Sequence, residues 1–228
     1  MTAVRLALPL LAALVLIVPV ACGGKDDQQT AEPTPLTLQQ QLLTAKDAPG
    51  SKPDPVEKGG TTADFDEFIQ ILNDVAIDPD TTEMTAVFKK ADFKGAGSST
   101  RFFGETHTRT APHLFNYVIQ LQSEDGATSA LDWLEADTMK PCPMDCAVQR
   151  SKFDVDDIPG ARGVHRSATA EDIARVGTKD ERPIDLYWVG FTDGPSVYSV
   201  TLQGQPGTVS EEQALKIASA YYERIAGN

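Results

Sequence analysis

The spacing of apolar residues divides the chain into helical and extended segments. Phe65, Phe68 and Leu72 recur at helical spacing, and acidic residues occupy the first turn of that segment. The same periodicity predicts further helices, the last of which starts with a capping box at Ser210. These helices cover 36–43, 84–91, the segment from 126 to the 142–146 loop, and 210–227.

From about Thr100 the period changes to two, which indicates strands. Phe115 and Tyr117 alternate with more polar positions, as expected for a half-buried strand. Strands are also predicted at 99–110, 151–155, 161–166, 186–191 and 197–202. The last two flank an Asp193-Gly194 turn, typical of a hairpin. Because strands joined by short turns pair antiparallel, we expect an α+β fold with one antiparallel sheet and helices packed on one face, in two layers.

The apolar leader resembles a bacterial lipoprotein signal peptide. Arg5 precedes an apolar run over 6–21, and Cys22 follows Ala21 directly. The resemblance implies cleavage before Cys22, acyl chains such as palmitate on the new N-terminus, and attachment to the extracytoplasmic face of the cell membrane. Pro19 stands three residues before Cys22, where the lipobox of such signals usually has leucine or a similar aliphatic residue.

Two other interpretations of the leader stay open: a retained transmembrane anchor, and an ordinary secretory peptide with an incidental cysteine. A spanning helix needs about 20 apolar residues, and two prolines interrupt this run. Under the lipoprotein interpretation, 1–21 is the signal peptide. Residues 22–35 then form a lipidated flexible tether, and 36–228 a single globular domain.

The net charge limits the classes of partner. The chain carries a formal charge of −13, which argues against binding nucleic acid and against electrostatic attraction to anionic lipids. Contact with the membrane is therefore expected through the lipid on Cys22 alone.

A second pair of cysteines, Cys142 and Cys146, predicts a disulfide bond. Two cysteines this close in an exported protein are usually oxidised. A redox role and thiolate binding of a metal are the alternatives. The spacing is C-x3-C rather than C-x2-C, and zinc would need a further cysteine or histidine nearby.

Three histidines are the other candidates for a metal site. His107 and His113 lie near a predicted turn and can approach each other, whereas His165 lies on a separate predicted strand. The sequence does not place a third ligand beside them, so we expect turn or surface histidines, with no metal and no cofactor.

Two polar segments and one group of aromatic residues are further candidates for binding a ligand. The aspartates of 154–157 lack the central glycine and distal glutamate of a calcium loop. The segment 95–100 lacks the lysine of a phosphate-binding loop, so we expect an ordinary loop there. Aromatic residues on helix and strand segments fit either the core or a ligand cleft between sheet and helices. They are Trp133, Trp188, Tyr187 and Tyr198.

Short motifs at 42–49, 158–162 and 221–224, together with the leader, resemble actinobacterial cell-envelope lipoproteins of unknown function. The layout is also similar to the extracellular sensor domains of actinobacterial membrane Ser/Thr kinases. The resemblance implies a non-enzymatic module that binds or senses a small envelope molecule or a protein partner. No catalytic motif is present. The alternatives are an envelope enzyme, such as a hydrolase, with an unrecognised site, and a structural spacer without a ligand.

Overall fold

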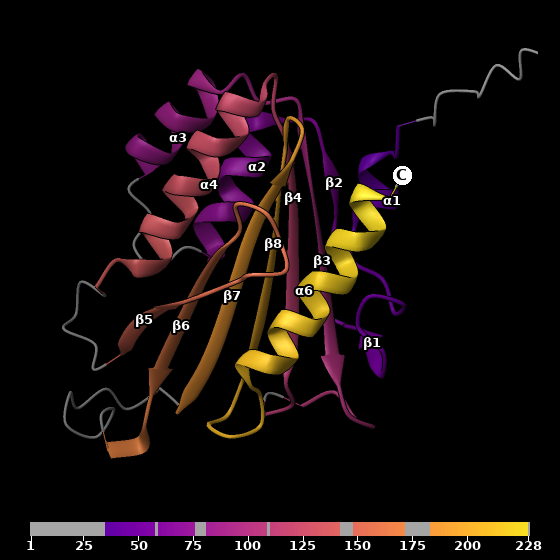
Figure 1. The fold of residues 1–228 in the computed structure, drawn as a ribbon, viewed down its shortest axis with the longest axis vertical. Coiled ribbons are helices and arrows are strands. Elements are labelled where there is room, and N and C mark those ends of the chain that lie inside the picture. The colour runs from indigo at the N-terminus through magenta and orange to yellow at the C-terminus, as the bar shows by residue number, and fades with distance from the viewer. Residues whose placement is uncertain are drawn as a thin grey trace, which may run out of the picture. The chain divides into compact units, whose positions relative to one another are not determined.

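The computed structural model describes residues 35–57, 59–75, 81–108, 110–141, 148–171 and 183–227 (Figure 1). Its helices are α1 (Leu38–Gln41), α2 (Phe65–Val75), α3 (Thr81–Lys90), α4 (Glu124–Met139) and α6 (Glu211–Ala226). Its strands are β1 (Ser51–Pro53), β2 (Gly60–Thr62), β3 (Gly95–Phe103), β4 (His113–Gln120), β5 (Gln149–Phe153), β6 (Arg162–Ala168), β7 (Ile184–Asp193) and β8 (Ser196–Gly204).

All strands belong to one antiparallel sheet in the order β1-β3-β4-β8-β7-β6-β5, with β2 also paired to β3. The predicted hairpin is present as β7 and β8. Asp193 pairs with Ser196, and Gly194 takes the positive φ of 54° that a tight turn needs. The predicted α+β class with an antiparallel sheet is confirmed.

The helices cover both faces of this sheet, whereas the sequence predicted one covered face. α6 and residues 36–48 pack on one face, and α2, α3 and α4 pack on the other (Figure 1). The domain therefore has three layers, and the side chains of the central β7–β8 hairpin explain why. β7 places Trp188 toward α4 and Val189 toward α6, and β8 places Val197 and Tyr198 in the same two directions. Apolar side chains on both sides of a strand require cover on both sides.

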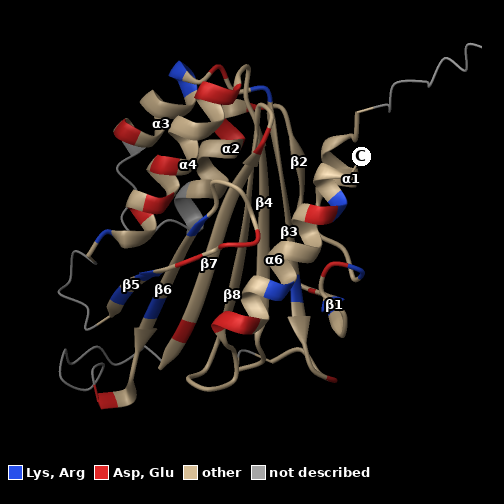
Figure 2. Ribbon diagram, in the orientation of Figure 1, with Lys and Arg blue, Asp and Glu red and all other residues tan. Residues whose placement is uncertain are grey.

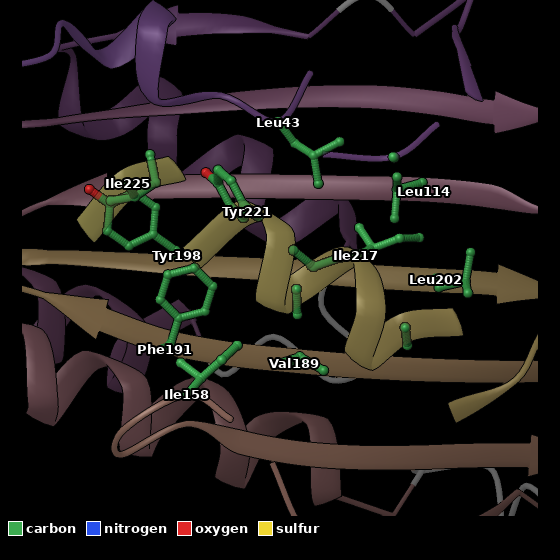
Figure 3. Close-up of a cluster of buried hydrophobic side chains, with 14 of the residues drawn as sticks. Leu43, Leu114, Ile158, Val189, Phe191, Tyr198, Leu202, Ile217, Tyr221 and Ile225 are labelled. Atoms are coloured by element: carbon green, nitrogen blue, oxygen red, sulfur yellow. The ribbon is translucent and has the colours of Figure 1, made fainter. Parts of the chain in front are cut away.

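Figure 3 shows the core on the α6 side, where aromatic side chains of the hairpin and of α6 meet. Phe191 stacks on Tyr198 with ring centroids 5.2 Å apart, and Tyr221 of α6 packs edge-on against both rings. Leu43 closes the same cluster from the N-terminal segment. This core fixes residues 36–48 against the sheet.

Strand β3 corrects the expectation of a loop at 95–100. A Cβ atom on Gly97 would lie 3.1 Å from Leu42 Cδ2, and one on Gly95 would lie 2.8 Å from Leu38 Cδ1. The glycines therefore let the N-terminal segment approach the strand closely, rather than breaking the chain. The sequence predicted no strand at 51–53 or 60–62, where the structure has the short strands β1 and β2.

Several predictions fall on residues that the structure does not describe. Cys22, Cys142 and Cys146 lie outside the described residues, as do the leader and nearly all of the predicted tether. Lipidation, the disulfide and the domain boundaries therefore stay predictions. Within the described part of the chain, no helix combines the length and the apolar character needed to cross a bilayer.

Candidate functional site

A cavity of about 240 Å³ lies between α4, α2 and the face of the sheet formed by β4, β8, β7 and β6. Its walls are mainly aromatic and aliphatic, and Trp133 of α4 and Trp188 of β7 both line it. Polar groups gather among them, including Gln203 of β8 and Arg166 of β6. Concave apolar sites with a few polar groups are the usual form of small-molecule sites.

The side chains of β4 differ in burial between the two faces of the sheet, and the less buried ones face the cavity. On this strand the residues directed to α6 are the more deeply buried, with Leu114 0% and Asn116 1% exposed. Phe115 and Tyr117, which alternate with them, are only half-buried and line the cavity. The sequence predicted the opposite polarity, with the aromatic positions buried and Asn116 on the polar side. Large rings left partly uncovered in a concavity are typical of a binding surface.

The structure separates the four aromatic residues that the sequence offered for a groove. Trp133 and Trp188 line the cavity, whereas Tyr187 and Tyr198 pack on the opposite face of the sheet with the α6 core. Trp133 also has a buried indole N–H without an acceptor among the described residues.

Arg166 supplies a positive charge to the described cavity lining, and no pattern in the sequence indicated it. Burial and the neighbouring charge of Arg150 lower the pKa of Arg166 to about 10, although Asp137 partly opposes this shift. The guanidinium therefore stays protonated at neutral pH. Its Nε–H is buried and finds no acceptor within the described residues.

A second guanidinium stands next to Arg166, because Arg150 is its cross-strand partner on β5. Figure 2 shows blue segments on both β5 and β6. Two N–H groups of Arg150, on Nε and on one terminal nitrogen, are also buried without acceptors in the described part of the chain. Asp137 of α4 lines the same cavity and supplies one opposing charge. Apolar walls bordered by the Arg166 guanidinium suit a ligand with an apolar body and an anionic or acceptor group.

The described lining of the cavity combines hydroxyl groups with the carboxylate of Asp137. This described lining offers the hydroxyls of Ser199, Thr201 and Thr138 but contains no histidine, the usual base for activating a hydroxyl.

Two of the three histidines approach the carboxylate of one aspartate, which the sequence did not indicate as a third ligand. His107 Nε2 lies 2.9 Å from Asp54 Oδ2, and His113 Nε2 lies 3.8 Å from the same oxygen. The two Nε2 atoms are 3.4 Å apart. His165 lies elsewhere, with Nε2 3.3 Å from Asp185 Oδ1. Asp54 was missed because it follows β1, an edge strand with no apolar alternation.

The remaining sequence candidates bring no ligand-binding groups together. Asp154, Asp156 and Asp157 are all exposed, and 95–100 belongs to β3. The segment 95–100 is therefore part of a strand rather than a loop.

Comparisons with known proteins support the class of fold. An antiparallel α+β sheet with a cavity under one helical layer defines the domain. No protein-family model matches the chain, and no curated protein sequence matches it significantly. Among solved structures the chain is similar to the extracellular domain of PknH from Mycobacterium tuberculosis, with a TM-score of 0.51 and 11% sequence identity. The match covers 86% of this chain and 99% of that domain. At this identity the likeness shows the fold alone.

Proposed function

We propose that the chain is an extracytoplasmic binding module of the cell envelope, held at the membrane by a lipid on Cys22. Its ligand is a small amphipathic molecule with an apolar body and an anionic head group. The observation that carries this proposal is the cavity under α4, in which two tryptophans flank a space that the buried guanidinium of Arg166 also borders.

The physical chemistry of Arg166 supports an anionic ligand. A buried N–H without an acceptor is costly, because burial removes the water that would otherwise bind it. Because Arg166 lines the cavity, a carboxylate or phosphate there would pair with its guanidinium through a charge-assisted hydrogen bond. The cavity equals roughly eight waters in volume, so the ligand or its inserted part is small.

The similarity of the fold to an extracellular domain supports the location, and a described cavity lining without a histidine supports binding over hydrolysis. The cavity itself disfavours a spacer without a ligand. The negative net charge gives the protein no attraction to anionic lipids, so the anchor would act alone.

Binding can be measured with the protein's own fluorescence. The chain has two tryptophans, and both line the cavity. Titrating the full chain with octanoate should change tryptophan emission in a saturable way. Octanol and octylammonium, which share the same apolar chain, should bind more weakly because they lack an anionic head.

The variant Arg166→Gln tests the role of the guanidinium. Octanoate should bind about tenfold or more weakly, since a hydrogen bond to a charged group contributes about 1.5–3 kcal/mol, whereas octanol should bind as before. Arg162→Gln is the matched control, because this arginine is on the same strand but bonds to the exposed Asp132 instead. Equal octanoate affinity in the two variants would contradict the proposal.

The anchor has a separate test. Cys22→Ala removes the thiol that would carry the lipid, so the protein should move from the membrane fraction to the soluble fraction of expressing cells. Metabolic labelling with a palmitate analogue should be lost at the same time. Unchanged membrane retention of Cys22→Ala would exclude lipid anchoring without touching the ligand proposal.

A further inference from the structure

We propose that Asp54, His107 and His113 form a binding site for a divalent transition-metal ion of the zinc type. The site lies where β1 ends and β4 begins, and it stands independently of the ligand proposed for the cavity. It uses one carboxylate and two imidazoles, the ligand types that zinc takes from proteins.

The three ligand atoms already have the spacing of a coordination sphere. Asp54 Oδ2, His107 Nε2 and His113 Nε2 are separated by 2.9, 3.4 and 3.8 Å. Zinc binds nitrogen and carboxylate oxygen at about 2.0–2.2 Å, so neighbouring ligands of a tetrahedral ion lie about 3.3–3.6 Å apart. The observed separations bracket that distance, and small side-chain rotations equalise them.

The carboxylate is fixed by groups that leave one oxygen for the metal. The side chain of Asp54 is 2% exposed. Its Oδ1 accepts hydrogen bonds from the backbone N–H groups of Val56 and Glu57, at 2.7 and 2.9 Å. The Asp54 N–H donates to the carbonyl of Thr100 on β3. Oδ2 is therefore held toward the histidines before any ion binds, which lowers the ordering cost of binding.

The two rings are also supported by packing. Phe102 contacts the ring of His107 edge-on at 5.3 Å, and His113 stacks on Phe115 at 6.2 Å. His113 is the first residue of β4 and pairs with Gln203 of β8, so its backbone is part of the sheet. His107 comes from the loop between β3 and β4, and its side chain is 28% exposed, which leaves a path for an ion from solvent.

Hydrogen bonds alone explain this arrangement less well than a metal does. If His107 Nε2 carries a proton, it donates to Asp54 and has no lone pair with which to accept a hydrogen bond from His113. The second histidine then directs its Nε2 at a nitrogen with no free lone pair. A metal ion accepts a lone pair from all three atoms at once. The ligand set excludes Mg²⁺ and Ca²⁺ as preferred ions, because these favour oxygen ligands, whereas imidazole suits zinc.

Three protein ligands leave a fourth tetrahedral position for water or for a donor group from another molecule. The site is thus of the open type rather than the closed four-ligand type of structural zinc sites. It borders the cavity, because Gln203 and Phe115 contact both regions.

The test is calorimetric titration of ZnCl₂ into the full chain, purified in mild detergent and stripped with a chelator. The wild type should bind one Zn²⁺ per chain. Asp54→Asn should lower the affinity at least tenfold while folding normally, because the asparagine oxygen still accepts from Val56 and Glu57. His107→Gln, in a loop, should lower it similarly, and circular dichroism without metal should match the wild type for both.

His165→Gln is the matched control, because His165 also faces an aspartate, Asp185, but has no second histidine beside it in the described structure. This variant should bind Zn²⁺ like the wild type. Co²⁺ titration should in parallel give visible absorption in the wild type that is lost in Asp54→Asn. Absence of one-to-one binding, or wild-type affinity in both Asp54→Asn and His107→Gln, overturns the proposal, as does loss of binding in His165→Gln.

Discussion

Asn116 is a polar residue at a fully buried position, and its hydrogen bonds explain why the fold tolerates it. Its Oδ1 accepts from the Leu43 N–H at 2.9 Å. Its Nδ2 donates to the Ser199 carbonyl and to the Tyr221 hydroxyl. The hydroxyl of Tyr221 donates in turn to the carbonyl of Gln41 at 2.7 Å. A buried polar network with all partners satisfied fixes one arrangement of the segments that it joins.

Removing one hydroxyl from this network tests its contribution. Tyr221→Phe leaves the Gln41 carbonyl buried without its donor, and we expect a loss of about 1–2 kcal/mol in the free energy of unfolding. Burial already raises the pKa of Tyr221, with Asn116 opposing that effect, so the hydroxyl stays neutral at all relevant pH values. Urea unfolding of the full chain, followed by far-UV circular dichroism, measures the change.

The adjacent tyrosine provides the control for this substitution. Tyr222 is half-buried at the margin of the same core. Tyr222→Phe should alter the stability by less than about 0.5 kcal/mol. If the two substitutions cost the same, the hydrogen bonds of Tyr221 do not add to the stability of the fold.

At the scale of elements, the sequence predicts helices and strands that have regular apolar spacing. It does not predict strands that depend on close packing against distant segments. The long helices and the β7–β8 hairpin follow from regular apolar spacing and from an Asp-Gly turn. β1 and β2 are three residues long and polar, so they have no periodic signal. β3 begins with glycines whose role depends on residues 38–42, which lie more than fifty positions earlier.

The candidate sites follow the same division. Trp133 and Trp188 are predictable as cleft residues, because large rings on a helix and a strand that face each other line either a core or a cavity. Arg166 could not be predicted as a cavity residue. An arginine on an alternating strand looks like a solvent-exposed residue unless the position of the covering helix is known. Asp54 depends on the register of β1 against β3, where Pro53 pairs with Arg101. No local pattern specifies that register.

At the scale of the whole domain, the last helix and the first described segment hold each other in place. Arg224 of α6 donates from Nε to Asp47 Oδ1 at 2.7 Å. Its two terminal nitrogens donate at 2.9 Å to the carbonyls of Gln40 and Leu42. One side chain thus ties α6 to three positions of residues 36–48, which cover the sheet face opposite the cavity.

Arg224→Lys separates the geometry of this contact from its charge. Lysine keeps the charge but is a point donor that cannot reach three acceptors in different directions as a planar guanidinium does. We expect the free energy of unfolding to fall by about 2 kcal/mol, because two backbone carbonyls lose a charged donor. Hydrogen exchange measured by mass spectrometry should become faster in residues 38–48, while β8 stays protected. Arg162→Lys, at a partly exposed arginine of β6 that pairs with Asp132 and Glu135 of α4, should leave hydrogen exchange at 38–48 near wild type. Unchanged exchange at 38–48 in Arg224→Lys would mean that the apolar contacts of Leu42 and Leu43 alone hold this segment on the sheet.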